Sequence, residues 1–234
     1  MTDLTLENLV LLNRSATIAR LLSGVAHDVN NALQVIGGSV ELLDDLALPD
    51  AAVTRIARIR TQHARAATVV QDLLAFARES PEGAASISVR DFVARALSLR
   101  AFSVSRAGLT LAFDAPDGQS FTVKANRMQL QQAVLNLIGN AEQSLAGKSG
   151  GAITVTLAVE HGLVVIRVAD NGPGVPIENR ERIFEPFFTT RPKADASGLG
   201  LTVARTIAGQ YGGSLVLEPL ESGATFALRL PSVS

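Results

Sequence analysis

Cysteine is absent from this 234-residue chain, tryptophan is absent too, and Tyr211 is the only tyrosine. Without cysteine the chain can form neither disulfides nor thiolate metal sites, and it is compatible with a reducing cytoplasm. So few aromatic side chains leave little material for stacking on nucleobases. Nucleic acid is therefore not expected among the partners.

Long apolar runs and excess charge are also missing. No stretch of about 18 uncharged apolar residues could form a membrane span, and the N-terminus lacks the basic start of a signal peptide. The net charge of -1 gives no field that would attract nucleic acid or an anionic membrane. Hydrophobic residues nevertheless make up 47% of the chain, which is ample for the core of one large or two small domains.

A heptad pattern near the N-terminus predicts one long helix over residues 4–47. Its seam consists of two interleaved, mostly apolar sets, Leu4, Leu11, Ile18, Val25 and Ala32, and Asn8, Ser15, Leu22, Val29 and Ile36. Pro49 ends this helix, and a second amphipathic helix is expected over residues 51–79. Two such hairpins make a four-helix bundle, so a homodimer would close the seam. Gly37-Gly38 could serve either close helix packing or flexibility.

His27 falls roughly opposite this seam, beside Asp28, and Asn31 lies one turn later on the same face. His27 is either a solvated surface histidine or a nucleophile whose ring Asp28 orients or deprotonates. The local sequence does not decide between the two. His63, on the second helix, has no acidic neighbour and is predicted to be solvated.

A break in composition at residues 80–84 predicts a linker between a helical region, residues 1–82, and a second region, residues 83–234. In the second region, strands are expected at 87–89, 109–113, 121–124, 152–159, 163–169, 214–218 and 225–230. Helices are expected at 91–99, 126–146 and 200–211, with a short helical piece at 177–184. This order predicts an α+β two-layer sandwich, one sheet with helices on one face.

Two clusters in the second region suggest chemistry. Asn136 and Asn140 lie four residues apart on a helix, so their amides share a face and suit a Mg²⁺ shell or a phosphate, unless they are ordinary surface amides. Asp170 ends a strand and precedes Gly172 and Gly174. Its carboxylate could accept a hydrogen bond from an exocyclic amine such as that of adenine, and a plain tight turn is the alternative.

A third cluster, Ser197-Gly198-Leu199-Gly200, opens a helix, where backbone N–H groups favour an anion. Its spacing is neither the Walker nor the Rossmann pattern. The long connection before it, residues 170–198, is rich in glycine, proline and charge. We expect it to be a lid that gates nucleotide access.

Five motifs in this order resemble those of the two-component sensor histidine kinases. They are the stretch His27-Asp28-Val29-Asn30-Asn31, the pair Asn136 and Asn140, the stretch Asp170-x-Gly-x-Gly, the stretch from Ile183 to Thr190, and Gly198-x-Gly200-Leu201. The first is most similar to nitrogen-regulation and hybrid kinases. The resemblance covers essentially the whole chain. It implies a dimerisation and histidine-phosphotransfer hairpin followed by a catalytic ATP-binding domain of the gyrase, MutL and heat-shock chaperone type.

The resemblance also implies residue roles. His27 Nε2 would attack the γ-phosphate of ATP, Asp28 would be base or orienter, and Asn31 would help to place water for dephosphorylating a regulator. ATP and Mg²⁺ are the implied cofactors, with Asn140 as the metal ligand and Asn136 as its helper. The other nucleotide-site residues are Asp170, Gly172, Gly174, the lid anchors Phe184 and Phe187, Arg191, Lys193, Ser197, Gly198, Leu199 and Gly200.

The ATP site differs from that of related ATPases at one position and from the kinase family's pattern at others. Related ATPases carry a glutamate where this chain has Asn136, which cannot act as a general base, so phosphate should go to His27 rather than to water. Gln143 stands where some relatives carry a basic phosphate contact, and Ala196-Ser197 replaces the usual Gly-Thr.

Two functional hypotheses follow. The first is a cytoplasmic autokinase that passes phosphate from His27 to an aspartate of a response-regulator receiver domain, with regulator phosphatase as a further activity. The second is a non-enzymatic phosphotransfer or scaffold protein with a degenerate ATP site. No sensor domain is recognisable, so the input is expected from a separate sensory protein or from residues 1–20, unless the chain is a fragment of something larger.

Overall fold

The computed structural model describes residues 29, 31–43, 46, 48–77, 83–191, 198–218 and 222–233. The chain divides into two compact units, residues 1–78 and residues 79–234. The predicted boundary after residue 82 lies outside the described residues.

The first unit contains a helical segment, residue 29 and residues 31–41, and the helix α2, Asp50–Ala77. The first helix ends at residue 41 instead of the predicted 47, because its last turn tightens: Leu43 N donates to Val40 O over 3.3 Å. The predicted helix over residues 4–28 lies outside the described part. None of the helices that the structure describes has the combination of length and hydropathy needed to cross a bilayer.

The two helices of this unit meet at a small apolar cluster and at one histidine. Leu33 and Val70 are buried, 8% and 7% exposed. His63 Nε2 lies 2.7 Å from Leu33 O, and since a carbonyl only accepts, the ring nitrogen donates. A Cβ at Gly37 would lie 2.9 Å from the His63 ring, so this glycine serves close helix packing. The prediction that His63 is solvated is wrong, because its partner is a backbone carbonyl 30 residues away.

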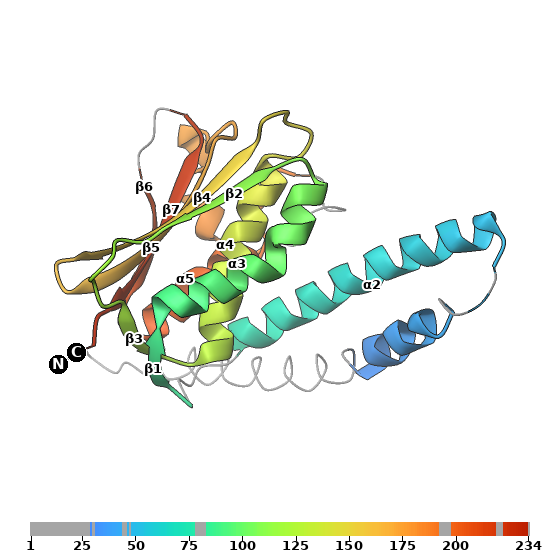
Figure 1. Ribbon diagram of the computed structural model, residues 1–234, viewed down its shortest axis with the longest axis horizontal. Coiled ribbons are helices and arrows are strands. Elements are labelled where there is room, and N and C mark those ends of the chain that lie inside the picture. Colours follow the sequence, from blue (N-terminus) through green and yellow to red (C-terminus); the bar gives the residue numbers. More distant parts are fainter. Residues whose placement is uncertain are drawn as a thin grey trace, which may run out of the picture. The chain divides into compact units, whose positions relative to one another are not determined.

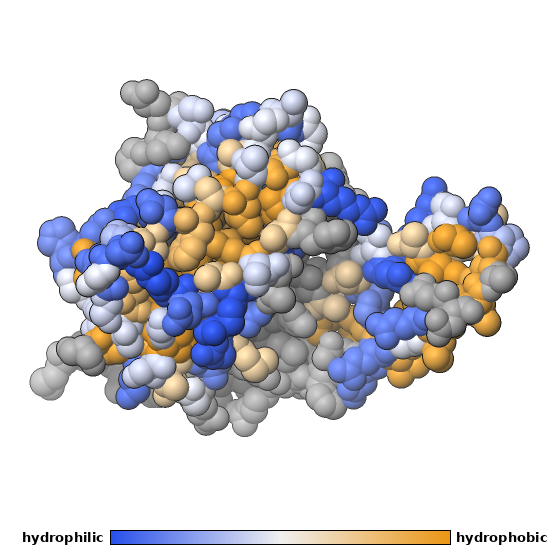
Figure 2. All heavy atoms as spheres, viewed as in Figure 1, coloured by the Kyte–Doolittle hydropathy of each residue, from blue (hydrophilic) through white to orange (hydrophobic). Residues whose placement is uncertain are grey.

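The three residues of the predicted seam that the structure describes, Val29, Ala32 and Ile36, are exposed within one chain. Among the described residues of this unit, the exposed large apolar side chains are Val29, Val35, Ile36, Leu42, Leu46, Val53 and Ile59. Figure 2 shows apolar surface of this kind along the helical unit. A single hairpin therefore leaves an apolar surface that a further helical partner could cover.

The second unit is built on a five-stranded sheet in the order β2-β4-β5-β7-β6. The strands are β2 (Thr110–Asp114), β4 (Ala152–Glu160), β5 (Leu163–Asp170), β6 (Ser214–Glu218) and β7 (Ala224–Pro231). All neighbours are antiparallel except the parallel pair β2 and β4. Alternate residues such as Ile153, Val155 and Leu157 are buried, so one face of the sheet carries the core.

Three helices cover that face: α3 (Val89–Arg106), α4 (Arg127–Ser144) and α5 (Gly200–Gln210) (Figure 1). The predicted two-layer α+β sandwich is confirmed. The predicted helix 91–99 continues to Arg106. Its serines lie on the exposed side, and their hydroxyls donate to carbonyls of the same helix, as the Ser98 hydroxyl does to Arg95 O, so they do not end the helix.

A second, smaller sheet corrects the prediction of a single one. Strand β1 (Ala85–Ser88) pairs with β3 (Thr122–Ala125), whereas β2 joins the large sheet. The strands predicted at 109–113 and 121–124 therefore do not pair with each other. The predicted piece at 177–184 is two short 3-10 helices, η1 (Ile177–Asn179) and η2 (Arg182–Phe184).

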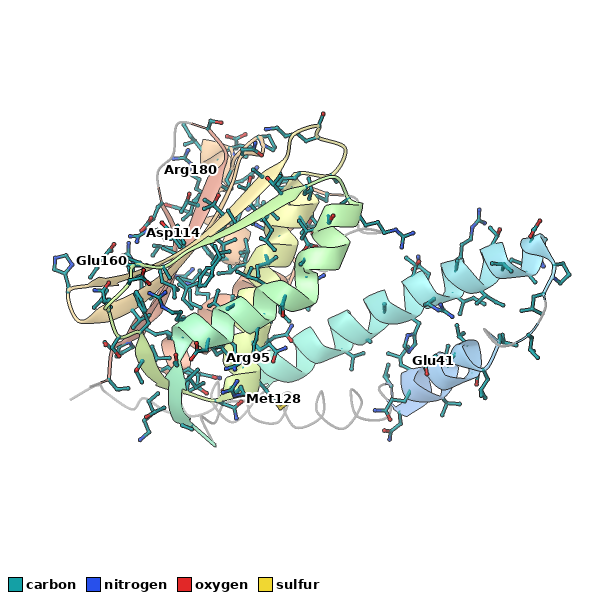
Figure 3. The ribbon with its side chains drawn as sticks, viewed as in Figure 1. Glu41, Arg95, Asp114, Met128, Glu160 and Arg180 are labelled. Atoms are coloured by element: carbon teal, nitrogen blue, oxygen red, sulfur yellow. The ribbon has the colours of Figure 1, made fainter. Side chains whose placement is uncertain are left out.

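A polar network ties the C-terminus of α5 to the N-terminus of α4. Asn126 caps α4 by accepting from Gln129 N, and its own N–H donates to the Tyr211 hydroxyl over 3.0 Å. That hydroxyl donates in turn to Gln129 Oε1, and Gln129 Nε2 donates to Gln210 Oε1 over 3.1 Å. Figure 3 marks the first turn of α4 at Met128. The two helices thus run antiparallel, and the N-terminus of α5 lies against the later turns of α4.

The other face of the sheet carries a charged network. Arg167 Nε donates to Glu218 Oε2 over 2.7 Å, and Arg167 Nη1 lies 2.8 Å from Oε1 of Glu160, which ends β4 in Figure 3. Arg229 also donates to Glu218. Hydrogen bonding to Arg167 lowers the pKa of both glutamates. The aliphatic stems of the arginines lie beside buried neighbours such as Val165, which pairs with Arg229.

Candidate functional site

One face of α4 presents three polar side chains in successive turns. Asn136, Asn140 and Ser144 are spaced by four residues, so each lies about 6 Å further along the helix. The opposite face of α4 is buried, with Leu137, Ile138 and other apolar residues in the core. The sequence pattern thus fixes which way the three polar groups project.

Asn136 connects α4 to the start of α5. Its Oδ1 accepts from Gln132 Nε2 over 3.0 Å, and its Nδ2 donates to Gly200 O over 3.1 Å. A Cβ at Gly200 would lie 3.7 Å from the Asn136 side chain, which is ordinary contact. The amide therefore positions the first turn of α5.

The N-terminus of α5 has no side-chain cap. Leu199 occupies the cap position, is only 2% exposed and makes no side-chain cap hydrogen bond. The first backbone N–H groups of an α-helix lack intrahelical partners, and the helix dipole is positive there. This end of α5 can therefore receive an anion such as a phosphate.

Asp170 is a buried carboxylate at the end of β5, 4% exposed. Its Oδ1 accepts two hydrogen bonds, from Ser144 Oγ over 2.9 Å and from Gly172 N over 2.8 Å. A Cβ at Gly172 would collide with Ser144 Oγ and lie 2.6 Å from Asp170 Oδ1. Only glycine at position 172 leaves this arrangement intact.

Gly174 and Gly223 bring two loops together beside this carboxylate. Gly174 has a φ of +77°, and a Cβ there would lie 2.8 Å from Gly223 O. A Cβ at Gly223 would in turn collide with the Asp170 carbonyl. Sequence reasoning missed Gly223, although a Ser-Gly pair directly before a strand is a recognisable turn signal.

The expected lid anchors differ in how they take part. The Phe184 ring meets Phe226 edge-on, with centroids 6.3 Å apart, and Thr202 Oγ1 on α5 donates to Phe184 O over 3.1 Å. The Phe187 ring is 66% exposed, and its backbone makes the contact instead: Phe187 N donates to Gly198 O over 3.0 Å. Phe187 has a φ of +64° and Gly198 a φ of +69°, so two left-handed residues lie against each other.

Arg191 brings a positive charge to α4. Its guanidinium donates to Gln143 Oε1 and, over 3.5 Å, to Asn140 O. Burial lowers the pKa of Arg191, and the negative charge of Asp170 partly offsets that effect. Arg191 thus places a cation beside Gln143, the position at which the sequence lacks a basic residue.

The side chains present fit a nucleotide with Mg²⁺. Within the described residues, no group of three or more histidine or acidic side chains is placed to hold a metal alone. The Asn140 amide makes no hydrogen bond there, so its oxygen could be one ligand among several from phosphate and water, as Mg²⁺ prefers. The other expected site residues, His27, Asp28, Lys193 and Ser197, lie outside the described part, and Asn31 is helical and exposed.

Two family models match the chain. Residues 17–82 match the His Kinase A phospho-acceptor domain, and residues 125–234 match the histidine kinase-, DNA gyrase B- and HSP90-like ATPase.

Curated relatives resemble almost the whole chain. The C4-dicarboxylate transport sensor protein DctB of Rhizobium meliloti is 32% identical over 96% of this chain and 36% of its own length. The sensor histidine kinase ZraS of Escherichia coli O157:H7 is 32% identical over 92% of this chain and 46% of its own length. The chain therefore spans less than half of the length of these relatives.

A solved structure of the histidine kinase ThkA in complex with the response regulator TrrA is also similar. It shares 25% identity with a TM-score of 0.64, over 94% of this chain and 64% of that chain. The chain belongs to the family of two-component sensor histidine kinases.

Proposed function

We propose that this chain is an ATP-dependent protein-histidine kinase that phosphorylates its own His27 and passes the phosphoryl group to an aspartate of a response regulator. The observation that supports this most strongly is the buried carboxylate of Asp170, which faces the same region as the uncapped start of α5 and the amide face of α4. Together these groups can receive a purine amine, a triphosphate and a cation.

Each part of the nucleotide has a matching group. The adenine amine donates to Asp170, and the phosphates lie near the N-terminus of α5 and the guanidinium of Arg191. Mg²⁺, when bound at Asn140, neutralises charge on the phosphates. Gly172, Gly174, Gly198 and Gly200 shape the backbone around the ligand, and Lys193 and Ser197 are further proposed nucleotide-binding residues.

The transfer reaction is a displacement at phosphorus. The lone pair of His27 Nε2 forms a bond to the γ-phosphorus while the bond from that phosphorus to its bridging oxygen breaks, and ADP leaves with the electron pair. The ring proton on Nδ1 passes to Asp28. An aspartate oxygen of the regulator then forms a bond to the phosphorus while the bond from Nε2 breaks, and Asp28 returns the proton to Nδ1, which restores neutral His27.

Asn136 favours transfer to His27 over hydrolysis. It cannot take a proton from water, and its amide is already bonded to Gly200 O. Water therefore lacks a general base at this position, which favours transfer of the phosphoryl group to the histidine. Asn31, one turn beyond His27, supports a regulator phosphatase as a further activity.

The proposed partners follow from the helical unit and from the relatives. A second copy of the hairpin would cover exposed apolar residues such as Ile36 and Val53 and form a four-helix homodimer. ThkA has been seen in complex with a response regulator, and we propose a receiver domain as the phosphoryl acceptor here. A separate sensory protein would supply the signal, and the need for ATP places the reaction in the cytoplasm.

Titration calorimetry with Mg-ADP separates this proposal from a scaffold that has lost nucleotide binding. Wild-type chain should bind, and Asp170→Asn should bind at least tenfold more weakly, because an amide of the same size loses the charge that attracts the amine (about 1.5–3 kcal/mol for a charged hydrogen bond). Asp114→Asn, an exposed carboxylate on β2 marked in Figure 3, is the matched control and should bind as wild type. Absence of binding by the wild-type chain would favour the scaffold.

A further inference from the structure

Ser144 is the one hydroxyl side chain in direct contact with Asp170 among the described residues. It ends α4, one turn after Asn140, and its Oγ donates to Asp170 Oδ1 over 2.9 Å. Gly172 N donates to the same oxygen over 2.8 Å. Two donors from different elements thus converge on one oxygen of a buried carboxylate.

This convergence leaves the second oxygen for a ligand. No hydrogen bond within the described part of the chain uses Asp170 Oδ2. If this oxygen were fully buried, it would be a buried polar atom without a partner, and the described residues have two such side-chain atoms, Glu142 Oε1 and Arg229 Nε. Oδ2 is therefore reached from outside the core. It is the acceptor that an incoming base would meet.

Two fixed donors on Oδ1 also fix the direction in which Oδ2 points. A carboxylate held by one donor can rotate about its Cβ–Cγ bond and exchange its oxygens, whereas a second donor on the same oxygen opposes that rotation. Gly172 N is part of the backbone and cannot adjust. The orientation of Oδ2 therefore depends on the Ser144 hydroxyl.

We propose that Ser144 is a positioning residue that makes the site select a 6-amino purine over a 6-oxo purine, a refinement that rests on the proposed binding of ATP. A fixed Oδ2 accepts from the exocyclic amine of adenine. A 6-oxo purine would set its carbonyl oxygen against the same carboxylate oxygen, and two acceptors repel. A carboxylate free to rotate could instead accept from the ring N1–H of the 6-oxo purine.

The test compares calorimetric affinities for Mg-ADP and for the 6-oxo analogue Mg-inosine diphosphate. Wild-type chain should prefer ADP, so the dissociation constant for inosine diphosphate divided by that for ADP should be well above one. Ser144→Ala should reduce this ratio by about tenfold, the loss expected for one hydrogen bond to a charged group. Ser144→Thr keeps the hydroxyl and should show the same ratio as wild type. Ser98→Ala on α3, whose hydroxyl bonds only to Arg95 O, is the matched control and should leave the ratio unchanged.

The ratio separates positioning from mere structural support. If Ser144→Ala weakens both nucleotides equally, or if Ser144→Thr discriminates as poorly as Ser144→Ala, the positioning role is overturned while ATP binding stands. If the wild-type chain binds neither nucleotide, the proposed function fails, and the inference fails with it. Circular dichroism of each variant verifies that the fold is retained.

Discussion

The side-chain amide of Asn136 donates to the backbone carbonyl of Gly200 over 3.1 Å. This bond joins the middle of α4 to the first turn of α5, 64 residues later in the chain. At the other end of the helix pair, Tyr211 and Gln129 hold the C-terminus of α5 at the base of α4. The N-terminus of α5 is therefore held against α4 at Asn136 before any ligand arrives.

Replacing Asn136 by aspartate should weaken Mg-ADP binding by about tenfold or more. The change keeps the size of the side chain but sets a carboxylate oxygen against Gly200 O, which costs about 1–3 kcal/mol for a donor lost in a partly buried place. Calorimetry measures the effect. Gln132→Ala removes the contact to Asn136 Oδ1 but keeps the bond from Asn136 to Gly200 O, so it should cost much less. Equal losses in the two variants would argue against the role given to the Gly200 contact.

Gly198→Ala should destabilise the second unit more than Gly118→Ala. Both glycines have positive φ values, +69° and +74°, so each substitution carries about 1 kcal/mol of backbone strain. A Cβ at Gly198 would also lie 2.5 Å from Phe187 C, whereas a Cβ at Gly118 meets nothing within 4 Å. Urea unfolding should show an extra loss of about 1–3 kcal/mol for Gly198→Ala, the usual cost of overpacking. Equal losses would mean that the lid backbone yields freely.

The two neighbouring glycines of the helical unit should respond differently to substitution by alanine. Gly38→Ala meets nothing within 4 Å and should stabilise the helix by about 1 kcal/mol, the difference in helix propensity. Gly37→Ala should lose that gain, because its Cβ would displace the His63 ring from Leu33 O. Hydrogen exchange of amides 31–41 would measure both effects. Adding His63→Ala should remove the penalty of Gly37→Ala, and a penalty that persists would contradict this explanation.

How far the sequence predicts the molecule depends on the range of the interactions. The helix α4 is predictable because Asn126 caps it and its apolar residues recur at helical spacing. The partner of β2 is not predictable from the sequence, because the turn between β2 and β3 would look the same if these two strands paired with each other. In the structure β2 instead pairs in parallel with β4, about 40 residues later.

In the candidate site, too, local patterns are predictable from the sequence and long-range contacts are not. Asn136 and Asn140 stand out by spacing, and continuing that spacing would have reached Ser144. Nothing near His63 in the sequence indicates the Leu33 carbonyl, and nothing near Gly223 indicates the Asp170 backbone, since both contacts form only when distant segments meet. The docking of Arg191 on Gln143 likewise bridges 48 residues.

Lowering the pH should remove the contribution of Arg167 to the free energy of unfolding. Its hydrogen bonds lower the pKa of Glu218 and of Glu160 from an ordinary value of 4.5, so the stabilisation is present above that pH and is lost as the pH falls through the lowered values. Glu160 is too exposed to contribute much, so Glu218 dominates. Arg167→Met should reduce the free energy of unfolding by about 1–3 kcal/mol at pH 7. The difference from wild type should shrink below pH 4.5, and a constant difference would contradict the ion-pair explanation.

The transfer of phosphate to His27 is tested most directly by incubating the chain with Mg-ATP labelled on the γ-phosphate. We expect a protein-bound label that acid removes and base preserves, as is typical of a phosphorus–nitrogen bond, and the complete loss of this label in His27→Ala. His63→Ala, which changes the histidine bonded to Leu33 O, should keep the label. A label that survives His27→Ala would contradict the assignment of His27 as the phosphoryl acceptor.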